Sequence, residues 1–76
     1  MINEFDRVVL TVDIPEAGLA AGDVATVVMV HGDHVGYELE FCSPSGETIA
    51  VVSAFPHRVR RAEPREVNHA RPLVAA

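Results

Sequence analysis

Residues 22–30 constrain the fold more than any other stretch of the chain. They read Gly-Asp-Val-Ala-Thr-Val-Val-Met-Val, so a glycine-aspartate turn leads directly into a run rich in β-branched residues. A loop that contains Pro15 and Gly18 precedes this turn. Glycine tolerates the backbone conformations of tight turns, and β-branched residues favour strands. The pattern predicts a corner of a small all-β domain.

Alternating apolar and polar residues predict the other strands. The strictest alternation covers residues 36–42, where Tyr37, Leu39 and Phe41 share one face of the strand. Glu38, Glu40 and Cys42 then lie on the opposite face. The expected strands are residues 5–12, 24–31, 36–42, 48–55 and 59–62.

Five short strands with a long first loop are typical of an SH3-like barrel. We expect residues 13–23 to form that loop, with Leu19 turned inward, and Pro56-His57 to form a single 3₁₀ turn. An OB-fold is the competing five-stranded barrel, but the chain leaves no room for its helix between Phe41 and Thr48. The predicted organisation is a barrel over residues 1–62 and a mobile, arginine-bearing tail over residues 63–76.

The core of this domain must be largely aliphatic. Hydrophobic residues make up 49% of the 76 residues, but aromatic residues only 5%. We expect the few aromatic residues to anchor the core, because each buries a large apolar area. These anchors are Phe5, Tyr37, Phe41 and Phe55. The strand at residues 36–42 is expected to pack its apolar face against Val8, Leu10, Val28 and Ile49.

The charges are distributed unevenly along the chain. The first 50 residues hold nine acidic residues and only Arg7, whereas residues 51–76 hold five arginines and two glutamates. This predicts an acidic body with a basic tail. The tail either folds back on the body, stays solvated, or meets an acidic partner or phosphates.

The first loop contains the run Pro15-Glu16-x-Gly18-Leu19-x-x-Gly22-Asp23, and the later strands contain Tyr37-Glu38-Leu39-Glu40-Phe41 and Gly46-Glu47-Thr48. These segments resemble a family of small bacterial proteins called DUF4926, and the first run is the most specific part of the resemblance. The resemblance covers about residues 5–62 and supports the predicted fold. It implies no activity, cofactor or partner. The tail after Ala62 is longer and richer in arginine than the family pattern.

No catalytic or metal-binding pattern emerges from the sequence. His31, Asp33 and His34 cluster at one turn, but a structural zinc site needs four ligands, and Cys42 is the only thiol. Glu38 and Glu40 on the same strand face oppose thiolate formation at Cys42. Gly18 and Gly22 precede a strand and lack the lysine of a phosphate-binding loop. We therefore expect no enzyme, no metal and no cofactor.

The composition favours a non-catalytic protein-binding or assembly module, for example an accessory subunit of a larger bacterial complex. Its partner is expected to be another protein or a second copy of the chain. The expected binding residues are charged: Glu38, Glu40, Arg58, Arg60, Arg61, Arg65 and Arg71. The apolar run at residues 72–76 offers a further contact.

Binding of nucleic acid by the arginine-bearing segment, as in KOW modules, is the alternative function. The acidic body repels phosphate, so we expect nucleic acid to bind weakly. A single cysteine and the lack of a membrane-length apolar run predict a cytoplasmic protein without a membrane anchor.

Overall fold

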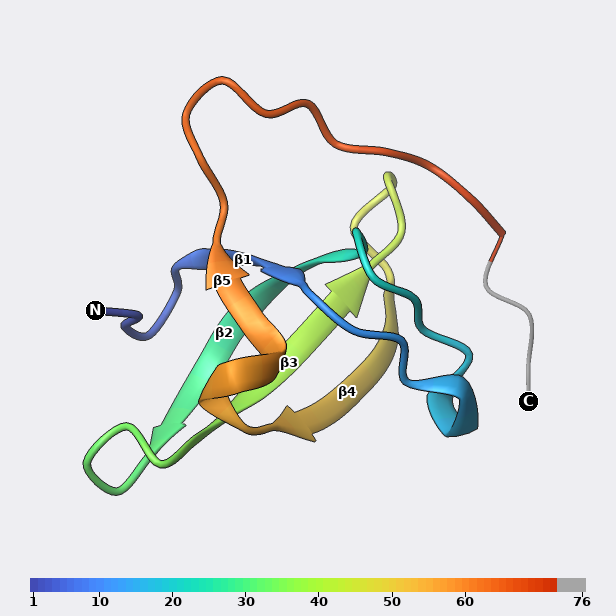
Figure 1. Cartoon of the computed structure of the whole chain (residues 1–76). Helices are drawn as coiled ribbons and strands as arrows, with labels where there is room; N and C mark the ends of the chain where they lie inside the picture. The colour runs from blue at the N-terminus through green and yellow to red at the C-terminus, as the bar shows by residue number, and fades with distance from the viewer. Residues whose placement is uncertain (73–76) are drawn as a thin grey trace.

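One antiparallel sheet of five strands forms the body of the molecule in the computed structural model, which describes residues 1–72 (Figure 1). The strands lie in the order β4-β3-β2-β1-β5. Their bounds are β1 Arg7–Leu10, β2 Val24–His31, β3 Gly36–Cys42, β4 Thr48–Ala54 and β5 Val59–Arg61. Two 3₁₀ turns complete the fold, η1 Pro15–Ala17 and η2 Pro56–Arg58. Residues 1–72 contain no helix long and apolar enough to cross a membrane.

The turn before β2 has the predicted conformation. Gly22 has a φ of +95°, which residues other than glycine rarely adopt, and its N–H donates to the carbonyl of Leu10.

The loop between β1 and β2 also folds inward as expected. Leu19 is 4% exposed and pairs with Ile14 through backbone hydrogen bonds. The loop therefore covers one end of the core.

The core lies on one face of the sheet, which we call the inner face. On β3, Tyr37, Leu39 and Phe41 are each at most 3% exposed, as their alternation predicts. The other core residues come from every strand and from the first loop: Val8, Leu10, Ile14, Leu19, Ala25, Val27, Ala54 and Val59. The opposite face, which carries Glu38 and Glu40, is the outer face.

Two core residues were predicted wrongly because of β-bulges. The register of β2 against β3 shifts between Val27 and Met29, so Val27 lies in the core and Val28 lies outside the core cluster. A second shift, between Phe41 and Cys42, leaves Ile49 without a partner on β3 and 42% exposed. A bulge moves one strand by a residue and so exchanges its faces.

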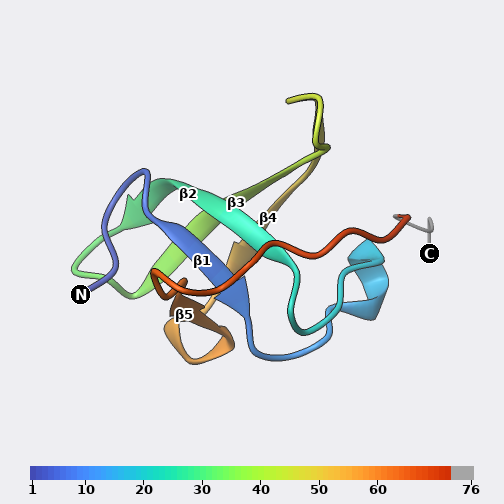
Figure 2. The same cartoon turned by 90° about the horizontal axis from the view of Figure 1, so that it is seen from above.

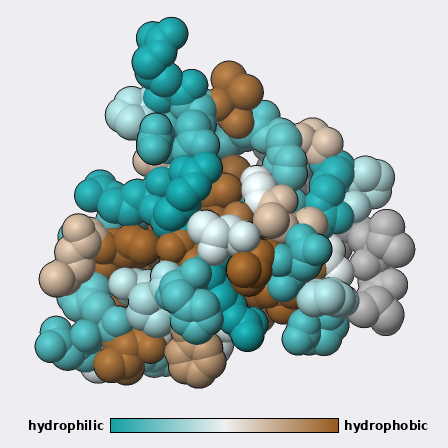
Figure 3. Space-filling view, viewed as in Figure 1, coloured by the Kyte–Doolittle hydropathy of each residue, from teal (hydrophilic) through white to brown (hydrophobic). Residues whose placement is uncertain are grey.

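Two of the predicted aromatic anchors are exposed. Phe5 has a φ of +72° in the turn before β1 and is 71% exposed, so β1 begins at Arg7 and not at residue 5. Phe55 follows β4, where the chain turns into η2, and is 60% exposed. Both lie where the chain leaves the sheet, away from the inner face. Apolar areas accordingly appear between hydrophilic ones on the surface (Figure 3).

The predicted closed barrel is wrong, because within residues 1–72 β4 and β5 remain the two free edges of the sheet. Strand β5 is only three residues long, and all three pair with β1. After Arg61 the chain leaves the sheet and passes the start of β2 (Figure 2). Up to Pro72, the last described residue, the chain therefore provides no further strand to join β5 to β4.

The inner face of β3 yields a stability prediction. Phe41→Ala should lower the free energy of unfolding by about 3–5 kcal/mol, because it leaves a cavity in the core. The matched control is Phe5→Ala, which removes the same atoms from a side chain that is 71% exposed and should cost less than about 1.5 kcal/mol. Urea unfolding of both variants provides the measurement. Equal losses would contradict the assignment of the core.

Candidate functional site

The outer face of β3 carries two carboxylates, Glu38 and Glu40, that the sequence analysis predicted to bind a partner. Glu38 accepts hydrogen bonds from the Ser53 hydroxyl and from His31 Nε2, the latter at 2.7 Å. Glu40 accepts one from the Thr48 hydroxyl at 2.6 Å. The hydrogen bonds from Ser53 and then His31 hold the pKa of Glu38 below its ordinary value. Glu38 is thus fixed on the outer face by contacts with β2 and β4, and Glu40 by a contact with β4.

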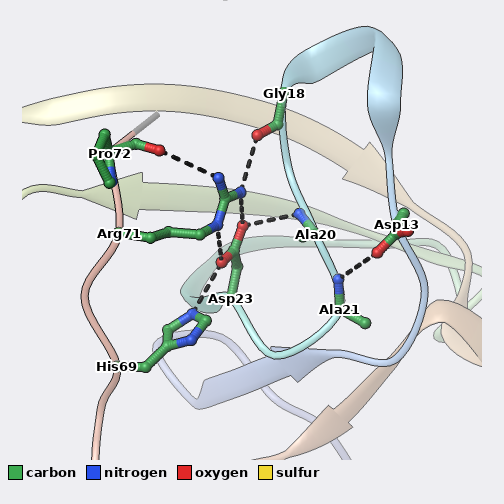
Figure 4. Close-up of polar contacts among 8 residues, drawn as sticks. All are labelled: Asp13, Gly18, Ala20, Ala21, Asp23, His69, Arg71 and Pro72. Carbon is green, nitrogen blue, oxygen red and sulfur yellow. Dashed lines mark hydrogen bonds and ion pairs between the residues drawn. The ribbon is translucent and has the colours of Figure 1, made fainter. Parts of the chain in front are cut away.

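Asp23, just before β2, is the most highly connected polar residue of the described chain. Its carboxylate accepts hydrogen bonds from the Ala20 N–H at 2.8 Å, from His69 Nε2 at 2.9 Å and from Arg71 Nε at 2.9 Å (Figure 4). Arg71 Nη2 contacts the second carboxylate oxygen and also donates to the carbonyl of Gly18 at 2.9 Å. The loop and the tail therefore meet at one carboxylate.

Burial and hydrogen bonding act on Asp23 in opposite directions. Burial alone raises the pKa of its carboxyl group, since only 9% of the side chain is exposed. The hydrogen bonds from Arg71, Ala20 and His69 outweigh burial, and the pKa lies below its ordinary value. The buried negative charge is satisfied, and it holds the tail against the body.

The tail bounds a broad groove on the outer face. The groove has a volume of about 860 Å³, and its walls are residues 68–71 of the tail and the hairpin between β3 and β4. Arg7, Thr26, Glu40 and Cys42 also line it. The predicted mobile tail thus carries specific contacts with the body up to Arg71. The apolar residues 73–76 lie outside the described residues.

The other four arginines that the sequence analysis predicted to bind a partner fall into two groups. Arg60 forms a bidentate pair with Glu66 at 2.7 and 2.6 Å, which together with the Glu63 N–H lowers the pKa of Glu66 to about 2. Arg61 lies 3.7 Å from Asp6. The side chains of Arg58 and Arg65 form no hydrogen bond or ion pair within residues 1–72. The predicted binding residues therefore do not form one cluster.

The histidines at the β2–β3 turn do not assemble a metal site. His31 binds Glu38, whereas His34 Nδ1 lies 3.7 Å from Asp33 and packs edge-on against Tyr37. No group of three ligating side chains is found in the described part of the chain.

Sequence reasoning missed Asp23, His69 and the free edge of β4. The only sequence signal for Asp23 is its place between a turn glycine and a strand, and nothing local indicates that residues 69 and 71 reach it. The β4 edge had a clear signal, since residues 48–54 carry no charge. An uncharged strand indicates a docking edge only if the strand lies at the edge of its sheet. The position of β4 in the sheet is known only from the structure.

The Asp23 cluster predicts a specific pH dependence. The pKa of the Asp23 carboxyl group is lower in the folded chain than in the unfolded chain. The stabilisation by the ionised carboxylate is therefore complete above about pH 3.8 and is lost as the pH falls through the pKa of the folded chain. Asp23→Asn should lower the free energy of unfolding by about 1.5–3 kcal/mol at neutral pH. The difference in the free energy of unfolding between Asp23→Asn and the wild type should shrink as the pH drops below 3.8.

Urea unfolding at a series of pH values tests this. Asp33→Asn is the control, because the Asp33 side chain is fully exposed and the substitution should change stability little at any pH. A deficit of Asp23→Asn that stays constant down to the lowest pH would contradict the assignment.

Comparison with known protein families finds a match for most of this chain. The domain of unknown function DUF4926 matches residues 4–60, which include all of β1 to β4 and Asp23 but neither His69 nor Arg71. No match was found among curated proteins or among solved structures. The contacts of the tail with Asp23 are thus made by residues beyond the matched region. Because the match covers most of the 76 residues, the chain belongs to the DUF4926 family.

Proposed function

We propose that this chain is a non-catalytic protein-binding or assembly module that docks its partner on the free edge of β4. The observation that carries the proposal is the contrast between the two edges of the sheet. Strand β5 has three residues, of which Arg60 and Arg61 are charged. Strand β4 has seven residues, Thr-Ile-Ala-Val-Val-Ser-Ala, and none is charged.

Edge strands expose unpaired backbone N–H and C=O groups, and monomeric proteins protect them with charge, proline or short length. Strand β5 has two of these protections, whereas β4 is seven residues long, has neither charge nor proline, and departs from a regular edge only at the bulge at Ile49. A long, uncharged edge is what strand addition by a partner requires, since backbone hydrogen bonds provide the affinity.

Side chains on the outer face of β4 add an apolar contact. Val51 is 55% exposed, and Ile49 is 42% exposed. Next to them Glu38 and Glu40 are held in place by Ser53 and Thr48 of β4 itself. A partner strand on this edge meets a short apolar strip, and the fixed negative charges of Glu38 and Glu40 lie one strand further in, on β3.

The contacts of the arginines support a protein partner over nucleic acid. Arg60 and Arg71 are paired with Glu66 and Asp23, so they offer less charge to phosphate than the sequence suggests. Phosphate binding needs several free cations on one surface. Cys42 is an exposed free thiol, in keeping with a module of the cytoplasm.

We also infer that the sheet is an SH3-like arrangement that is left open between β4 and β5. The strand order, the long loop between β1 and β2 and the 3₁₀ turn before β5 support this inference. The open side coincides with the proposed docking edge.

The test places a charge on the β4 edge. Val51→Lys should weaken partner binding at least about tenfold, because a lysine on an edge strand opposes strand addition. Val67→Lys is the matched control, since Val67 is 91% exposed in the tail and far along the chain from β4. Proteins captured by the immobilised wild type are purified, and their Kd for the three chains is measured by calorimetry.

Both variants must first show the melting temperature of the wild type within a few degrees. Equal loss of binding in both variants, or none in either, would count against the β4 edge. A duplex DNA titrated at physiological salt forms a parallel arm, in which sub-micromolar binding would favour the nucleic-acid alternative.

A further inference from the structure

We propose that the partner at the β4 edge is a second copy of this chain, paired β4 to β4 in antiparallel fashion about a two-fold axis at Val51. The inference rests on the proposed function, because it uses the same edge. It specifies the occupant, the register and one pair of charges between the two copies.

The register follows from the sequence of β4. Val51 is the middle residue of Thr48–Ala54 and lies on the regular part of the strand after the bulge at Ile49, so a two-fold axis there places Val51 opposite its own copy and Ala50 opposite Val52. Opposing residues in an antiparallel pair point to the same face. Both outer faces then lie on one side of the joined sheet, and both cores lie on the other.

Charge permits this pairing of identical surfaces. Because β4 carries no charge, the two-fold axis brings no like charges opposite each other within the strands. On the neighbouring strand β3 the acidic residues are Glu38 and Glu40. Two β4 strands separate them from those of the second copy, a distance of about 14 Å at ordinary strand spacing. That distance exceeds the screening length of about 8 Å at physiological ionic strength.

Opposite charges meet where the paired strands end. Glu47 directly precedes β4, and antiparallel pairing places this end of the strand beside the end of the second copy's β4, which leads into Phe55. Phe55 lines a small cleft of about 290 Å³ together with Arg58. Within residues 1–72 neither the Glu47 carboxylate nor the Arg58 guanidinium has an ion-pair partner. The two-fold axis therefore brings Glu47 of one copy and Arg58 of the other to the same end of the paired strands, twice per dimer.

The pairing also closes on itself. A two-fold contact uses the same edge of both copies, so each dimer keeps only its two β5 edges. Those edges are three residues long and carry Arg60 and Arg61. Further copies find no second β4 edge, and growth stops at the dimer.

Charge exchange tests the inference. Sedimentation equilibrium at physiological salt should show a dimer for the wild type. Glu47→Arg and Arg58→Glu should each raise the dimer Kd by at least about tenfold, because each places like charges together twice per dimer. The double variant should restore a Kd close to that of the wild type. A monomeric wild type, or a double variant no better than the single variants, would overturn the inference.

The register is tested separately by a disulfide. Opposing Cα atoms in an antiparallel pair lie about 4.5–5.5 Å apart, within the range that a disulfide spans. In a Cys42→Ser background, Val51→Cys should form an intermolecular disulfide on mild oxidation, whereas Val67→Cys should not. Equal cross-linking of both variants would overturn the register.

These outcomes are distinct from failure of the proposed function. If the wild type is monomeric and Val51→Lys still abolishes binding of a captured protein, the dimer is wrong and the docking edge stands. If Val51→Lys leaves both the oligomeric state and the capture unchanged, both proposals fail.

Discussion

The packing of the inner face of β3 is the interaction on which the rest of the molecule depends. Tyr37, Leu39 and Phe41 are almost fully buried, and β3 pairs with β2 on one side and β4 on the other. In a chain of 76 residues the apolar area that can be buried is small, so this one strand supplies a large part of it. Its burial also fixes the opposite side chains, Glu38 and Glu40, on the outer face.

The contacts of the charged residues show that a linear charge pattern describes this surface poorly. The sequence separates an acidic body from a basic tail, and the fold pairs the two at Asp23 and Arg71. Arg60 instead finds its partner within the tail, at Glu66. Within residues 1–72 the edge of β4 is the longer and the uncharged one of the two sheet edges that lack a partner strand.

Local patterns predicted the strands and turns well, because their causes are local. The strict alternation at residues 36–42 and the positive φ at Gly22 both follow from the chemistry of neighbouring residues. The errors at Val28 and Ile49 come from bulges, which depend on how two strands meet. The contact of His69 with Asp23 joins residues 46 positions apart, and no local pattern indicates such a contact.

That long separation has a consequence for how the tail can move. The hydrogen bonds of Arg71 end on the Asp23 side chain and on the backbone of Gly18 and Pro72, and none of them ends on a strand. Release of Arg71 therefore leaves every strand pairing of the sheet intact. The groove then opens on the side that residues 68–71 form, while the hairpin between β3 and β4 keeps its place as the other wall.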